Sequence, residues 1–80
     1  MFIKLMRVDI RSGEIKPIRV KYDNIDYFFH SKEIIGSGTP PTFMDVTYVA
    51  MNSENSIYVM ETPEEVENAV MFEVNKYQER

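Results

Sequence analysis

The chain has 80 residues, a net charge of −4 and no cysteine, and 44% of its residues are apolar. This length fits one domain with a thin core, and this apolar content is too high for a disordered chain. The lack of cysteine excludes disulfides and thiolate metal sites and favours a reducing compartment, so we expect a cytoplasmic protein. No apolar run approaches the roughly 20 residues that cross a bilayer, so we expect no membrane partner.

Charge is unevenly distributed along the chain. Residues 1–21 contain six basic and two acidic residues, whereas residues 22–80 contain three basic and eleven acidic ones. The acidic balance argues against general nucleic-acid affinity. The basic segment either forms a local patch or lies near the acidic segments and partly neutralises them.

Two strands are predicted in the first third of the chain. Residues 2–10 form a β-rich tract, and residues 15–22 alternate apolar and basic side chains, as a half-buried strand does. Gly13 predicts a turn between them, so the two segments should form an antiparallel hairpin. Pro17 has no backbone donor, which indicates a sheet edge or a strand start.

Three further strands are expected after this hairpin. They lie within residues 25–35, 42–51 and 57–61. In the first of them, the alternation of Ile25, Tyr27 and Phe29 predicts a core-facing row, with Phe28 on the opposite face. The alternative is that these aromatic residues, close in sequence to Arg19, stack on a single-stranded nucleic acid or a nucleotide.

The last predicted element is a helix over residues 63–78. Thr62 and Glu65 have the spacing of a capping box. The apolar stripe of this helix contains Val66, Ala69, Val70, Val74 and Tyr77. Met71 and Phe72 lie on its two flanks, where they either pack under a sheet or contact a second subunit.

These elements predict one small α+β domain over residues 1–80. Its expected architecture is an antiparallel β-meander of about five strands with one C-terminal α-helix packed on one face. Residues 36–41 form the longest connection, which we interpret as an ordinary loop, with an anion-binding loop as the alternative.

The catalytic inventory is poor. His30 is the single histidine, and adjacent strand residues point to opposite faces, so it should not meet Ser31. No glycine-rich phosphate loop leads into a helix, and no spacing of acidic residues fits a metal site. We therefore expect no enzyme, no cofactor and no metal.

Two function classes stay open. The favoured one is a non-catalytic interaction protein, accessory or regulatory, that self-associates or docks on a larger protein. Its expected interface residues are Phe28, Phe43, Met71 and Phe72. The alternative is a protein that binds or sequesters a nucleotide or another phosphorylated ligand. Its expected contacts are Arg19, Lys21, Tyr27, His30, Lys32, Ser37, Gly38 and Thr39.

Three segments carry a resemblance to a known family. They are "IKL" at 3–5, "PIRVKYDNID" at 17–26 and "IYVMETPEEVENAV" at 57–70. Their order resembles the small FlbD/SwrD-like flagellar and swarming proteins, and the chain also has the general look of a small phage or bacterial accessory protein. The resemblance implies a strand pair that leads to a capped helix, and "GSGTPP" resembles an insertion. It implies no functional residue here.

Overall fold

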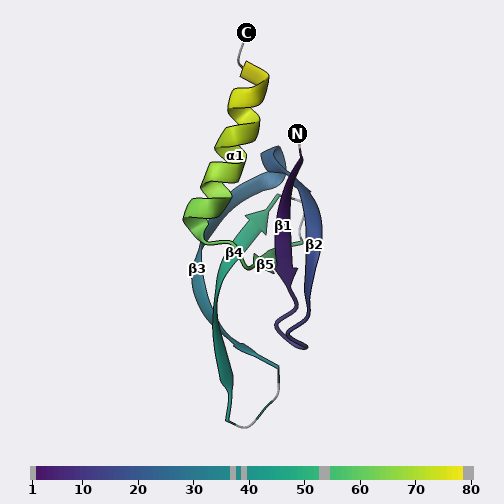
Figure 1. Ribbon diagram of the computed structural model, residues 1–80, viewed down its shortest axis with the longest axis vertical. Helices are drawn as coiled ribbons and strands as arrows, with labels where there is room; N and C mark the ends of the chain where they lie inside the picture. Colours follow the sequence, from purple (N-terminus) through teal and green to yellow (C-terminus); the bar gives the residue numbers. More distant parts are fainter. Residues whose placement is uncertain (1, 37, 39, 53–54, 79–80) are drawn as a thin grey trace.

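The computed structural model describes residues 2–36, 38, 40–52 and 55–78, with helix side chains to residue 76. Figure 1 shows its elements in chain order. They are β1 (Phe2–Val8), β2 (Ile15–Lys21), a 3₁₀ turn (Tyr22–Asn24), β3 (Ile25–Ile35), β4 (Thr42–Met51), β5 (Ile57–Val59) and α1 (Pro63–Gln78). No helix in this part of the chain is long and apolar enough to cross a membrane.

The five strands form one antiparallel sheet in the order β2-β1-β5-β4-β3. β1 and β2 pair along their whole length, and β3, β4 and β5 form a meander. β5 joins the two parts, because it also pairs with β1 through Arg7–Val59 and Val8–Tyr58. The predicted α+β fold is therefore confirmed. However, β2 and β3, which follow each other in the chain, lie at opposite edges of the sheet.

The main cluster of buried apolar residues lies on the face of the sheet that carries α1. Its buried residues come from four strands and the helix, and they are Ile3, Leu5, Val20, Val49, Ile57, Val59 and Val66. Val66 is fully buried, and Ala69 and Val70 pack against the same cluster one turn later. Residues three and four apart share one face of a helix, so the first half of α1 fixes the helix to the sheet.

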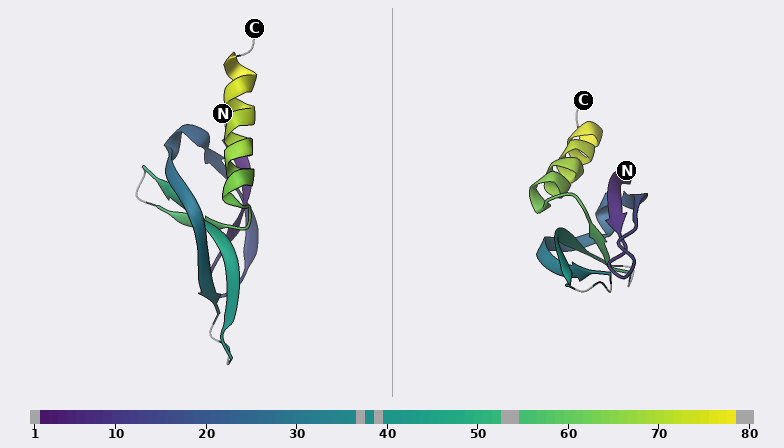
Figure 2. Two further views of the ribbon diagram at one scale, coloured as in Figure 1. Left: turned by 90° about the vertical axis from the view of Figure 1, so that its left-hand side faces the viewer. Right: turned by 60° about the horizontal axis from the view of Figure 1, so that its bottom comes forward.

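α1 begins with the predicted capping box. The backbone N–H of Glu65 donates to Thr62 Oγ1 (3.1 Å), and the backbone N–H of Thr62 donates to Glu65 Oε1 (2.9 Å). From this start the helix runs past the sheet, while the β3–β4 hairpin extends in the opposite direction (Figures 1 and 2). The molecule is therefore elongated, with extents of 54 × 22 × 19 Å.

A bulge in β3 reverses the predicted orientation of its aromatic residues. Between Ile25 and Tyr27 the register with β4 shifts, so β3 accommodates one extra residue. Ile25 and Phe28 both pack against the core, whereas Tyr27 and Phe29 are 56% and 47% exposed. The prediction of Phe28 as a surface residue and of Tyr27 and Phe29 as core residues is therefore wrong. A period-two pattern changes phase at a bulge.

The β1–β2 turn contacts the end of β3. Gly13 has a φ of +81°, and a Cβ atom at this position would lie 3.0 Å from Cγ2 of Ile35. Glycine is therefore required here for its left-handed backbone and for the close approach. The backbone N–H of Gly36 donates to the carbonyl of Ile10 (2.8 Å). This bond occupies the backbone immediately after β3.

Glu61 completes the hydrogen bonds of β1 beyond the short strand β5. The backbone N–H of Met60 donates to the carbonyl of Met6 (2.9 Å). The backbone N–H of Met6 donates to both carboxylate oxygens of Glu61 (3.0 and 3.1 Å). The hydroxyl of Thr47, which is fully buried, donates to the Glu61 carbonyl. Glu61 therefore connects β1, β4 and the segment that leads into α1.

Candidate functional site

The first candidate surface is the β3 edge, defined here as the outward side of residues 27–33. β3 is an outer strand, so no described strand pairs with this side. Its sequence, YFFHSKE, has no proline or glycine and one lysine. Tyr27 and Phe29 are about half exposed along it. A long outer strand with apolar side chains and little charge is a template for pairing with another strand.

The opposite side of the sheet ends in the β2 edge, which has different chemistry. Lys16, Pro17, Arg19 and Lys21 are all exposed on this strand. Pro17 has no N–H to donate, and the three cations repel a second copy of the same strand. The β2 edge is therefore protected against strand addition, and the β3 edge is not.

An aromatic row crosses the face of the sheet opposite α1. The rings of Tyr27 and Phe29 are stacked with centroids 6.1 Å apart, and Phe29 lies 5.2 Å from Tyr48. Tyr48 in turn makes an edge contact with Tyr58 at 5.3 Å. The row therefore runs from the β3 edge across β4 to β5. Aromatic pairs of this kind contribute about 0.5–1.5 kcal/mol each beyond area burial.

The side chain of Tyr58 lies near the carboxylate of Glu33. Burial raises the pKa of Tyr58, and the nearby negative charge of Glu33 raises it further. Glu33 also accepts a hydrogen bond from the hydroxyl of Ser31. A raised tyrosine pKa means that the folded state favours the neutral phenol. The associated stabilisation is complete below the ordinary pKa near 10 and is lost as pH rises through the higher folded-state value.

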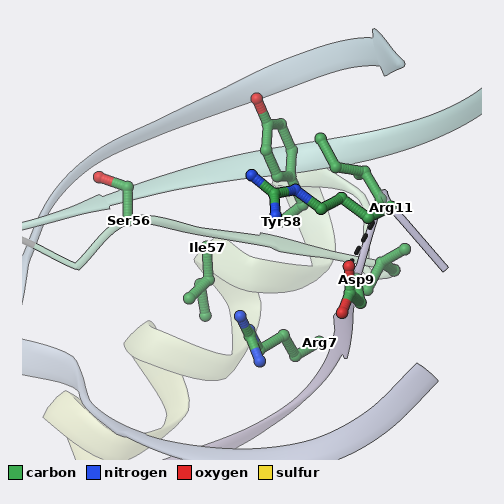
Figure 3. A pocket seen from close by; sticks show the side chains of 8 residues that line it. Arg7, Asp9, Arg11, Ser56, Ile57 and Tyr58 are labelled. Atoms are coloured by element: carbon green, nitrogen blue, oxygen red, sulfur yellow. Dashed lines mark hydrogen bonds between the residues drawn. The ribbon is translucent and has the colours of Figure 1, made fainter. Parts of the chain in front are cut away.

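An opening of ≈ 360 Å³ lies at the end of the row, between β1 and β5. It is lined by Arg7, Val8, Asp9, Ile10, Arg11, Ser56, Ile57 and Tyr58. Figure 3 shows Arg11 on the same side of β5 as the Tyr58 ring, and Arg7 on the other side, next to Ile57. The backbone N–H of Arg11 donates to Asp9 Oδ1 (2.9 Å).

The residues predicted as a protein interface are separated in space. Phe28 packs against the core, as described above. Phe43, near the start of β4, is 58% exposed, and Met71 and Phe72, in the second half of α1, are 47% and 67% exposed. Phe43 and Phe72 lie on elements that point toward opposite ends of the molecule (Figure 1). They do not form one continuous patch.

The residues predicted as ligand contacts do not converge either. Arg19 and Lys21 are on β2, whereas Tyr27, His30 and Lys32 are on β3, at the other edge of the sheet. Gly38 is exposed in the loop between β3 and β4. Ser37 and Thr39 lie outside the described residues. The predicted anion site is therefore not assembled by the fold.

His30 makes a surface contact with Asp45. Its Nε2 atom lies 3.0 Å from Asp45 Oδ1, and the two side chains are 59% and 68% exposed. Ser31 bonds to Glu33 on the other face of β3, so His30 and Ser31 do not act on each other, as the sequence predicted. Among the described residues, no group of three His, Asp or Glu side chains is placed to hold a metal ion.

Sequence reasoning missed the arginine-lined opening. Arg7 and Arg11 stand just before and within the predicted turn, but the partner segment around Ser56 and Tyr58 is about 50 residues away in the chain. The pairing of β1 with β5 brings them together, and no local pattern encodes that pairing. The available signal in the sequence was the pair of arginines near the end of a predicted strand. Such pairs are too common to indicate a binding site.

A comparison with known proteins found no family model, no curated protein and no solved structure that matches this chain.

Proposed function

We propose that this chain is a non-catalytic interaction protein that self-associates by pairing the β3 edges of two copies. The observation that supports the proposal is the contrast between the two sheet edges, one carrying proline and cations and the other aromatic and unprotected. Two β3 strands would pair antiparallel around a twofold axis, so that both copies use the same surface. The cysteine-free composition favours a reducing compartment such as the cytoplasm.

The geometry gives this contact two sources of free energy. Pairing supplies backbone hydrogen bonds along the β3 edge, and with the twofold axis near Phe28 it places Tyr27 of one copy opposite Phe29 of the other. Covering four half-exposed rings contributes roughly 1 kcal/mol each. Association costs several kcal/mol of lost freedom, so we expect a micromolar rather than a nanomolar dimer.

Sedimentation velocity over roughly 1–200 µM protein tests the proposal. The wild-type chain should shift from monomer to dimer, and the double variant Tyr27→Lys/Phe29→Lys should stay monomeric because each added cation would face an added cation of the other copy. Ile15→Lys is the matched control, since Ile15 is 41% exposed on the β2 edge. It should dimerise like the wild type.

Two outcomes would contradict the proposal. One is a wild-type chain that stays monomeric throughout the range. The other is a double variant that dimerises like the Ile15→Lys control. Phe72→Asp distinguishes the helix from the edge, because Phe72 is 67% exposed and lies on the projecting half of α1. If Phe72→Asp alone dissociates the dimer, the contact runs through α1 instead of β3.

A further inference from the structure

We propose that the opening between β1 and β5 binds a nucleotide unit, with its base against Tyr58, its phosphate at Arg11 and any second phosphate at Arg7. This inference does not rest on the pairing of β3 edges, because the opening lies on the other side of β4 and β5. It reassigns the phosphorylated-ligand hypothesis from the residues predicted by the sequence to residues that the fold brings together.

The opening exists because two strands separate. β1 and β5 share only two residue pairs, which end at Val8 and Tyr58. Beyond them β1 turns toward β2, since the backbone N–H of Asp9 donates to the carbonyl of Glu14 (2.8 Å). Ser56, in the segment just before β5, lines the opening across from the end of β1. Pockets of about 300–1,000 Å³ are the usual size of small-molecule sites, and this one is ≈ 360 Å³.

The charge of the opening suits an anion. Neither Arg7 nor Arg11 forms an ion pair with a carboxylate in the described part of the chain. Asp9 also lines the opening, but one of its oxygens already accepts the backbone N–H of Arg11 (2.9 Å). The lining therefore carries two guanidinium groups and one carboxylate. The planar fork of a guanidinium matches the oxygens of a phosphate.

Tyr58 supplies a rigid ring beside these charges. Tyr48 makes an edge contact with its ring at 5.3 Å, and the carboxylate of Glu33 lies near its side chain, so neighbours on β4 and β3 limit its movement. Figure 3 shows the Tyr58 ring and the Arg11 guanidinium on one side of β5, with Arg7 on the other side. A base stacked on an aromatic ring gains about 1–3 kcal/mol. A ligand lying across β5 would therefore meet a ring and a positive charge on one side and a second positive charge on the other.

The net charge of −4 disfavours a long polyanion, so the expected ligand is small. Both a free mononucleotide and a short single strand carry a base next to phosphate. They differ in the number of phosphates, because a strand supplies one on each side of the base. Arg7 should therefore matter for a strand and much less for a nucleotide with a single phosphate.

Isothermal titration calorimetry of the full chain tests the inference with four probes. They are adenosine 5′-monophosphate, adenosine, inorganic phosphate and a trinucleotide of adenylate. Adenosine 5′-monophosphate or the trinucleotide should bind at least about tenfold more tightly than adenosine or phosphate alone. Arg11→Gln should weaken binding roughly tenfold, because it removes a charge-assisted contact. Arg19→Gln, an equal charge change on the β2 edge, should leave binding unchanged.

The remaining arms identify the ligand and exclude misfolding. If the trinucleotide binds most tightly and Arg7→Gln weakens it as Arg11→Gln does, the ligand is a single strand. If Arg7→Gln has no effect, it is a mononucleotide. Tyr58→Phe keeps the ring and should retain binding, whereas Tyr58→Leu should lose it. The inference is overturned if no probe binds at about 1 mM, if adenosine binds as tightly as its monophosphate, or if Arg11→Gln behaves like Arg19→Gln.

Discussion

The two outer strands of the sheet differ in length, in proline content and in the number of cations, which all affect strand addition. β2 has seven residues, and its proline and three cations are all exposed. β3 has eleven residues, with a bulge at its start and a backbone contact just beyond its end, and half-exposed aromatic residues between them. Proteins that stay monomeric generally protect both edges of a sheet. Protection of one edge alone therefore supports the proposed pairing through the other.

An inner edge supports the same interpretation. β1 extends beyond the short strand β5, so β5 does not pair with its backbone at Met6. There the Met6 N–H donates to the carboxylate of Glu61, and the Met6 carbonyl accepts the N–H of Met60. A single side chain, that of Glu61, therefore accepts the backbone N–H on an unpaired stretch of β1 that is only one or two residues long. The middle of β3 has no comparable device among the described residues. Substitutions on β3, at Glu61 beside β1 and on β2 can test this difference between the edges.

Proline substitutions in β3 should have the largest effect. Ser31 and Lys32 are adjacent, so the N–H of one points toward β4 and that of the other toward the open edge. Proline at the inward position should cost about 3 kcal/mol, because it removes a ladder hydrogen bond and clashes with β4. Proline at the outward position should leave stability nearly unchanged and abolish dimerisation. Urea denaturation with sedimentation measures both.

Ser31→Ala and Lys32→Ala are the controls for lost side chains. Two proline variants with equal stability and equal dimerisation would show that the β3 backbone takes no part in association.

Replacement of Glu61 by alanine should have an intermediate effect. The variant leaves the Met6 N–H without its carboxylate acceptor, which costs about 1–3 kcal/mol for a partly buried donor. Urea denaturation should show this loss, and Glu65→Ala, which removes an exposed carboxylate of the capping box, should lose about 1 kcal/mol or less. Equal losses in the two variants would remove any special role for Glu61 at the inner edge.

Substitution of Pro17 by valine should have the smallest effect on stability and should change assembly. Valine restores a backbone donor on β2 and suits a strand, so the free energy of unfolding should change by less than about 0.5 kcal/mol. The β2 edge then becomes available, and sedimentation at high concentration should show species larger than the dimer. Pro17→Lys also restores the backbone N–H but adds a cation, so it separates the effect of the backbone donor from that of the side chain. If neither variant forms larger species, the cations alone protect β2.

Local patterns in the sequence were sufficient for the elements and for the start of the helix. Period-two segments marked the strands, and the Thr62–Glu65 spacing predicted the capping box that the hydrogen bonds show. Such patterns depend on neighbouring residues, so one chain is enough to read them. The side of the sheet on which Tyr27 and Phe29 lie was predicted wrongly, because the extra residue of the β3 bulge has no fixed sequence signal.

The strand order and the arginine-lined opening could not be predicted, since both depend on β1 pairing with β5. Only two residue pairs form this contact, and Arg7 and Val59 are far apart in the chain. Periodicity shows that each strand has a core side but not which strand lies beside it. Consequently Arg7 and Arg11 looked like ordinary surface cations, although the fold places them around one opening with Tyr58.

The bond between Met6 and Glu61 spans 55 positions of the chain, and this separation affects how the protein is made. During translation, β1 and β2 leave the ribosome before β5 and Glu61 do, because the chain is synthesised from its N-terminus at about 5–20 residues per second. For a few seconds the nascent hairpin has an unsealed inner side, which other unfinished chains can pair with. Closing so long a loop is also slow relative to local hairpin formation. The last quarter of the chain therefore completes the helix and ends this interval of vulnerability.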